Sequence, residues 1–234
     1  MTAQSGRLGI GIVGAGRVGP VLGAALAGAG HAIVGVAAIS QSSRDRAEAM
    51  LPGVPILELP QLIERSELVI LAVPATQLGS LVAGLAAAGV WQPGQLVLYT
   101  AAEFGYSVLA PAMAAGAIPL AVHPAMVFTG TSLDLVRLRE TYFAVTAPAP
   151  VLPIGQALVV EMGGEPIVIA ESDRAVYAEA VATAVGFSAE IVRQSVELLA
   201  TVGVEAPAQL LGPLLRSSLE TALHRAGPSD DFVG

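Results

Sequence analysis

Short apolar runs alternate with longer Ala- and Leu-rich segments along most of the chain. The longer segments have helical spacing and predict helices over Val18–Gly30, Gln77–Ala88 and Val151–Met162. The short runs, rich in β-branched residues, predict strands at Leu8–Val13, Ala32–Ile39, Val54–Leu57, Leu68–Val73, Gln95–Thr100, Ala117–Val122, Tyr142–Thr146 and Pro166–Ala170. Apolar strands separated by helices are typical of a mostly parallel sheet that is covered on both faces.

The strand pattern stops after Ala170. The next segment predicts one long helix, capped by Ser172 or Asp173 and ended by Gly203, with Gly186 as a candidate kink. A second helix runs toward Arg225. The pattern therefore predicts an α/β fold, with a Rossmann-type domain over residues 1–170 and a small all-α region over residues 171–234.

A glycine-rich turn follows the first predicted strand. Gly14, Gly16 and Gly19 form a G-x-G-x-x-G pattern that opens a predicted helix. In a dinucleotide site the first glycine allows the tight turn, the second lets the backbone approach the pyrophosphate, and the third lets helix and strand pack closely. The alternative is an ordinary glycine-rich turn. The position between strand and helix favours a dinucleotide site, which would also include Ala15, Arg17 and Val18.

The end of the second strand bears on the choice of dinucleotide. An NAD site usually has an acidic residue there, to bind the ribose 2′-hydroxyl. Here the first acid is Asp45, and the tip carries Ser40, Ser42, Ser43 and Arg44. Hydroxyls and a guanidinium suit a 2′-phosphate, which favours NADP(H) over NAD(H). The alternative is that Ser42 or Ser43 simply caps the next helix.

The composition excludes several classes of function. The 234 residues are 54% hydrophobic and 13% charged, and the net charge of −8 argues against a nucleic-acid partner. All eleven basic residues are Arg, and Cys is absent, so a Lys acid, a Cys nucleophile and a thiolate metal site are excluded. The uncharged stretches Val18–Ser43 and Leu68–Ala102 are broken by Pro and Gly. We therefore expect a soluble, cytoplasmic protein without a membrane span or a metal.

Two later strand ends supply candidate catalytic residues. His123 ends an apolar run on the side of the sheet where ligands bind, and imidazole suits proton transfer near neutral pH. Tyr99 is a second candidate donor, and Glu103 follows it closely. For both His123 and Tyr99 the alternative is a structural role: a histidine that caps a strand, and a partly buried aromatic ring.

Five segments together resemble a known family: GIGIVGAGRVGPVLGAAL, LAVPATQ, AVHPAMVFTGTS, YFAVTAPAP and EMGGEPIVIAESDRAVYAEA. They are similar to Rossmann-like NADP oxidoreductases that carry a C-terminal helical domain of unknown function. These proteins are related to 6-phosphogluconate dehydrogenase-type and pyrroline-5-carboxylate reductase-type enzymes, and include members similar to ketopantoate reductase. The resemblance covers nearly the whole chain.

The resemblance implies a homodimer formed through the C-terminal helices, with the active site between these helices and the nucleotide domain. Val73, Pro74 and Ala75 end another strand at the carboxyl edge of the sheet, where ligands bind, and are expected cofactor contacts together with Thr100. Substrate contacts are expected at Met126 and Thr129, and at Gly186 and Phe187, where the long helix meets the cleft; the alternative for Phe187 is a core residue. Three features depart from the family pattern: the run Tyr99–Ala102, the segment AVGFSAE around Gly186, and the short helical region.

Two functions follow from these observations. The first is a reductase that transfers hydride from NADPH to a C=O or C=N bond of a small substrate, such as a 2-keto acid like ketopantoate or an imine. In that case His123, assisted by Tyr99, supplies the proton or orients the acceptor. The second is a non-catalytic NADP-binding protein, either a sensor or an assembly partner.

Overall fold

The computed structural model describes residues 7–226. The first six residues of the predicted Rossmann-type domain and the last eight residues of the predicted helical region lie outside the described residues. The chain divides into two compact units, Met1–Glu179 and Ala180–Gly234. The first contains seven strands: β1 Gly9–Val13, β2 Ala32–Ala37, β3 Leu68–Leu71, β4 Leu96–Tyr99, β5 Ile118–Pro124, β6 Tyr142–Thr146 and β7 Glu165–Val168.

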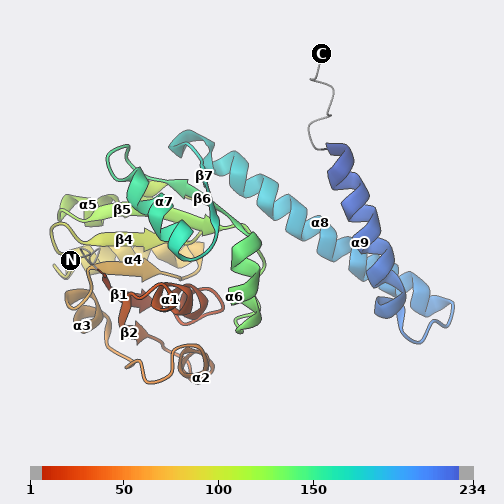
Figure 1. Cartoon of the computed structure of the whole chain (residues 1–234), viewed down its shortest axis with the longest axis horizontal. Coiled ribbons are helices and arrows are strands. Elements are labelled where there is room, and N and C mark those ends of the chain that lie inside the picture. The colour runs from red at the N-terminus through yellow and green to blue at the C-terminus, as the bar shows by residue number, and fades with distance from the viewer. Residues whose placement is uncertain (1–6, 227–234) are drawn as a thin grey trace, which may run out of the picture. The chain divides into compact units, whose positions relative to one another are not determined.

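These strands form one sheet in the order β2-β1-β3-β4-β5-β6-β7 (Figure 1). The first five strands are parallel, β6 is antiparallel to β5, and β7 is parallel to β6. The predicted fold class, a Rossmann-type mostly parallel sheet, is confirmed. The order changes direction between β1 and β3, and this is the point where open α/β sheets bind their ligands.

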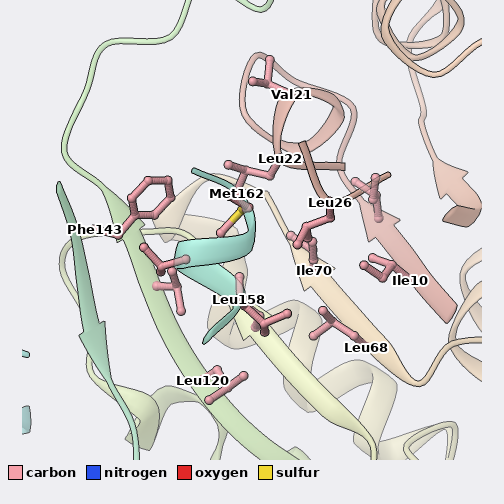
Figure 2. Close-up of a cluster of buried hydrophobic side chains, with 14 of the residues drawn as sticks. Ile10, Val21, Leu22, Leu26, Leu68, Ile70, Leu120, Phe143, Leu158 and Met162 are labelled. Carbon is pink, nitrogen blue, oxygen red and sulfur yellow. The ribbon is translucent and has the colours of Figure 1, made fainter. Parts of the chain in front are cut away.

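Alternate residues along each strand point to opposite faces of the sheet, so the helices bury two separate apolar clusters. One face packs against α1 (Gly19–Gly28) and α7 (Leu152–Glu161), and its core includes Ile10, Leu120 and Phe143 (Figure 2). The other face packs against further helices: α3 Leu59–Glu64, α4 Ala75–Ala87 and α5 Ala110–Ala114. Short elements complete the unit: α2 Gln41–Met50, α6 Leu133–Arg137 and the 3-10 helices Tyr106–Leu109, Leu138–Glu140 and Glu171–Asp173.

The predicted strand over Val54–Leu57 is wrong. Only a single bridge between Val36 and Ile56 forms there. Pro55 has no backbone N–H to donate, and Pro52 and Gly53 turn the chain just before it. The segment therefore contributes two hydrogen bonds, from Val36 N to Pro55 O and from Leu57 N to Val36 O, instead of a ladder.

Two helices follow the sheet, α8 (Arg174–Thr201) and α9 (Pro207–Ala226). α8 begins in the first unit and continues through Gly186 without a break, so the candidate kink there does not interrupt the helix. Gly203 ends the helix as predicted. Its φ is +80°, and Val204 N donates to Leu199 O while Gly203 N donates to Ala200 O, which is the Schellman arrangement.

The stretch Glu171–Thr201 is long and apolar enough to cross a membrane by length and composition, and none of its most apolar window is buried. Its polar side chains form ion pairs along one side of α8. Arg193 bonds to Glu190 at 2.5 Å and to Glu197 at 2.6 Å. The helix is therefore two-sided rather than apolar all round.

Candidate active site

The three glycines of the turn between β1 and α1 differ in what surrounds them. Gly14 has a φ of +98°, and a Cβ there would lie 2.4 Å from the carbonyl oxygen of Ala72. A Cβ on Gly19 would lie 2.3 Å from the carbonyl oxygen of Gly14, so α1 can approach β1 only with glycine at this position. A Cβ on Gly16 would meet nothing within 4 Å. Packing thus requires Gly14 and Gly19, but not Gly16.

A cavity of about 620 Å³ opens beside this turn, at the point where the strand order changes direction. Its wall combines the glycine-rich turn, the residues after β2 and β3, and one side of α4. Its lining residues are Val13, Gly14, Ala15, Gly16, Ala37, Ala38, Ile39, Ser40, Ser43, Leu59, Ala72, Val73, Pro74, Gln77, Ser80 and Leu81.

The end of β2 contributes hydroxyl groups to the cavity and no carboxylate. The N-cap of α2 is Ser40, whose side chain accepts a hydrogen bond from the Ser43 amide at 3.2 Å. The alternative caps considered from the sequence, Ser42 and Ser43, are therefore wrong. The reason is that Ser40 is the last extended residue, and capping residues have that backbone conformation. Ser42 and Arg44 are exposed on α2 and do not line the cavity.

The other expected cofactor residues fall into two groups. Val73 and Pro74 line the cavity. The remaining ones do not: Arg17, Val18, Gly19, Ala75 and Thr100. Thr100 is buried directly after β4, one strand further along the same edge of the sheet.

Arg46 lies at this turn as well, although the sequence did not single it out. Its Nη1 donates to the carbonyl oxygen of Ala15 at 3.0 Å. Arg46 follows Ser43 by three residues and therefore lies on the same side of α2, which is the signal that could have identified it. A Cβ on Gly130 would lie 3.1 Å from Arg46 Cδ and 3.2 Å from Arg17 Cα, so the loop after β5 packs against both arginines.

A buried carboxylate orders that loop. Asp134 is fully buried and accepts hydrogen bonds from the amides of Thr129 and Gly130, at 2.8 and 2.7 Å, and from the Thr129 hydroxyl at 2.9 Å. Met126, the other expected substrate contact of this loop, accepts a hydrogen bond from the Thr141 hydroxyl at its sulfur, at 3.4 Å. In this structure both Thr129 and Met126 bond within the loop region itself.

His123 pairs with a tyrosine that the sequence did not indicate. Its Nδ1 lies 2.8 Å from the hydroxyl of Tyr177, which belongs to the first turns of α8, and the two rings meet edge to face. Burial, reinforced by the positive charge of Arg174, lowers the pKa of His123 from 6.5 to about 4. The imidazole is therefore neutral near pH 7 and can donate or accept one hydrogen bond at each nitrogen.

Tyr99 has a different environment. It is fully buried at the end of β4, and its hydroxyl donates to the carbonyl oxygens of Phe104 and Gly105, the latter at 2.9 Å. Burial raises the pKa of Tyr99 well above its ordinary value. These contacts favour the structural alternative for Tyr99, that of a buried aromatic whose hydroxyl holds the loop after β4.

Arg174 joins these groups on one face of the sheet. Tyr99, Ala121 and Thr146 are neighbours across β4, β5 and β6, and His123 lies two residues beyond Ala121 on the same face. The Arg174 guanidinium bonds to Thr146 and lies 5.7 Å from the centre of the Tyr177 ring. His123, Tyr177 and Arg174 therefore form one polar cluster, at the same edge of the sheet as the cavity at β1 and β3.

Two expected substrate residues belong to the second unit. Gly186 and Phe187 lie on α8 beyond Glu179, a Cβ on Gly186 would meet nothing within 4 Å, and Phe187 is exposed. Their contact with substrate stays a prediction.

Two family descriptions match the chain. A Rossmann-like domain covers residues 2–124, and a domain of unknown function, DUF2520, covers residues 141–234. No curated protein matches the chain in sequence.

Several solved structures share the fold. A protein from Bacteroides fragilis assigned as an NADP oxidoreductase is 18% identical, with a TM-score of 0.77 over 97% of this chain and 85% of its own. The 1-pyrroline-5-carboxylate reductase of Streptococcus pyogenes is 17% identical, with a TM-score of 0.70 over 97% and 82%. The pyrroline carboxylate reductase of Plasmodium falciparum, with NADP bound, is 13% identical, with a TM-score of 0.66 over 97% and 82%. The chain thus belongs to the Rossmann-like domain family, and its C-terminal part matches DUF2520.

Proposed function

We propose that the protein is a reductase that transfers hydride from NADPH to a C=O or C=N bond of a small organic substrate. The observation that carries the proposal is that the dinucleotide-type cavity and the His123–Tyr177 pair lie at the same edge of one sheet. The names of the structural neighbours, NADP oxidoreductases and pyrroline-5-carboxylate reductases, agree with it.

The residues around the cavity fit a dinucleotide. Gly16 is free of contacts from the protein itself, so its backbone is open to a pyrophosphate. Ile39 lines the cavity and is 98% exposed as a residue, which suits an apolar contact with an adenine ring. Hydroxyls from Ser40 and Ser43, without a carboxylate, favour the 2′-phosphate of NADP(H) over the free ribose of NAD(H).

When bound, NADPH supplies the hydride, and the protein provides for the proton. His123 is neutral at physiological pH, so its Nε2–H would donate a hydrogen bond to the carbonyl oxygen or imine nitrogen and pass its proton to that atom as hydride transfer makes it basic. The Tyr177 hydroxyl would then return a proton to Nδ1 and recover its own from solvent, since Tyr177 is half-buried. The Tyr177 hydroxyl fixes the ring of His123 through Nδ1, which leaves Nε2 for the substrate. A cyclic imine can bind already protonated, so its reduction requires less proton donation from the His123–Tyr177 pair than the reduction of a ketone does.

The reductase proposal is tested by following NADPH oxidation against a panel of small 2-oxo acids, ketones and cyclic imines. Turnover of at least one class, with NADPH preferred over NADH, supports it. Tight NADPH binding without turnover of any class supports the non-catalytic sensor or assembly protein instead.

The glycines give a matched pair of variants for the cofactor site. We expect Gly16→Ala to fold with unchanged stability but to bind NADPH about tenfold more weakly, because the new methyl group occupies the space of the pyrophosphate. We expect Gly19→Ala to lower the melting temperature, because its Cβ meets the Gly14 carbonyl. Calorimetry and fluorescence titration with NADPH check both. Unchanged NADPH affinity in Gly16→Ala would place the cofactor elsewhere.

We also propose that the protein is a soluble, cytoplasmic homodimer formed through α8 and α9. Phe187, Ile191 and Leu198 recur on one side of α8, and each is at least 50% exposed in the single chain. The ion pairs of Arg193 lie on another side of the helix, facing solvent. A long helix with one apolar and one ionic side suits a protein partner better than a lipid bilayer.

The dimer proposal predicts a dimeric mass by light scattering for the wild-type protein. The double variant Phe187→Glu/Leu198→Glu should be monomeric, since it places charges in the apolar side of α8. Val136→Glu is the matched control, because Val136 is a 66% exposed residue of α6. A wild-type monomer, or a double variant that stays dimeric, would refute the proposal.

A further inference from the structure

Arg174, the first residue of α8, is almost completely buried, with 1% of its surface exposed. Its Nε donates to the Thr146 hydroxyl at 2.7 Å, and its Nη2 donates to the carbonyl oxygens of Ala121 and Ala144 at 2.9 and 3.0 Å. Three neutral acceptors from β5 and β6 therefore fix the guanidinium in one orientation.

No ion pair in residues 7–226 includes Arg174. Glu171, one turn before it, interacts with its charge, but the Glu171 carboxylate accepts hydrogen bonds from the amides of Tyr106 and Ser107 at 2.7 and 3.0 Å. Burying a cation without a paired anion costs several kcal/mol. The guanidinium of Arg174 thus has no carboxylate at ion-pair distance in the described residues.

The unused part of the guanidinium is well defined. Nη1 of Arg174 is buried and has no acceptor in the described part of the chain. Buried polar atoms without a partner are uncommon in proteins, and each one requires an explanation. Because Nε and Nη2 are already bonded, Nη1 is the group left to bind an anionic oxygen.

This group lies beside the proposed reaction centre. Arg174 Cζ is 5.7 Å from the centre of the Tyr177 ring, and the Tyr177 hydroxyl is 2.8 Å from His123 Nδ1. His123 and Tyr177 are both half-buried, so solvent reaches the cluster at these two rings. Tyr177 therefore contacts both the ring of His123 and the guanidinium of Arg174, so a ligand at His123 lies in the same side-chain cluster as this cation.

We propose that Arg174 binds the carboxylate of the substrate, so that the substrate is a small 2-oxo or 2-imino acid. The inference rests on the proposed reductase function and adds the substrate class to it. A carboxylate next to the reducible carbon reaches Arg174 while the carbonyl oxygen or imine nitrogen faces His123. Arginine suits this role because its planar guanidinium stays charged when buried and bonds carboxylates with defined geometry.

Acetate is the probe, because it is the smallest common carboxylate with a carbon substituent and does not depend on the shape of the true substrate. Spectra of protein with isotope-labelled arginine side chains are recorded during an acetate titration, with chloride at equal ionic strength as the control. We expect a saturable shift of the Arg174 guanidinium signals. Arg174→Gln should weaken acetate binding by about tenfold or more, whereas Arg65→Gln, which removes an exposed arginine, should not.

The acetate titration of the wild-type protein tests carboxylate binding by Arg174 even if the Arg174→Gln variant does not fold. No shift of the Arg174 signals, or equal acetate affinity in a folded Arg174→Gln variant, overturns the inference. Stronger binding of inorganic phosphate than of acetate overturns the carboxylate assignment in favour of a phosphate group. NADPH binding is titrated on the same samples, so that loss of the carboxylate site is distinguished from failure of the reductase proposal.

Discussion

Replacing His123 by Ala is expected to lower kcat by roughly 10²–10⁴-fold, the usual contribution of a positioned proton-transfer group. The affinity for NADPH should change little, because His123 lies at the end of β5 and does not line the cavity beside the glycine-rich turn. Steady-state kinetics and a fluorescence titration on the same preparation measure the two quantities separately.

Tyr177→Phe is the companion variant. It removes the hydroxyl that bonds to His123 Nδ1 and keeps the aromatic ring, so we expect a smaller loss of kcat than for His123→Ala. His224→Ala, at an exposed position of α9, is the control for loss of a histidine. Full turnover by His123→Ala with normal NADPH binding would remove His123 from the mechanism.

The free energy of unfolding is expected to fall on acidification between about pH 6.5 and pH 4, with His123 contributing at most about 3 kcal/mol. The sign follows from the lowered pKa. In this window the unfolded histidine binds a proton and the folded one does not, so acid favours the unfolded chain. The contribution is fully present above pH 6.5 and is lost as the pH falls toward about 4.

Urea unfolding of wild-type protein and His123→Gln at several pH values measures this contribution. Gln can still bond to Tyr177 but does not titrate, so the variant should lose less stability than wild type between pH 7 and pH 5. A parallel decline in both proteins would show that His123 is already protonated near its ordinary pKa, and would restore it as an imidazolium acid.

Much of the fold follows from local sequence patterns. Apolar strands buried on both faces, helices between them, and a glycine turn after the first strand each depend on residues close together in the chain. Gly14 and Gly19 show why the motif was informative: their neighbours, Ala72 and Gly14 itself, leave no room for a Cβ. The strand at 54–57 failed because one proline removed the donor that a ladder needs.

The candidate site could be predicted from the sequence only in part, because its contacts join residues that are far apart in the chain. His123 and Tyr177 are 54 positions apart, and Arg174 reaches Ala121 across 53. Tyr99 was a candidate proton donor because it is a tyrosine at the end of a strand. In the structure it is buried, and its hydroxyl donates to two backbone carbonyl oxygens. The pairing of Tyr177 with His123 depends on where the first turns of α8 pack, and no local pattern specifies that.

Transfer of deuterium from NADPH labelled at one face of the nicotinamide tests the central proposal most directly. With the 2-oxo or 2-imino acid that gives turnover, wild-type protein should deliver the label from one face only to the reduced carbon. His123→Ala should deliver it from the same face at a much lower rate. If the protein binds NADPH but no carbonyl or imine substrate gives a reduced product that carries the label, the reductase function is contradicted.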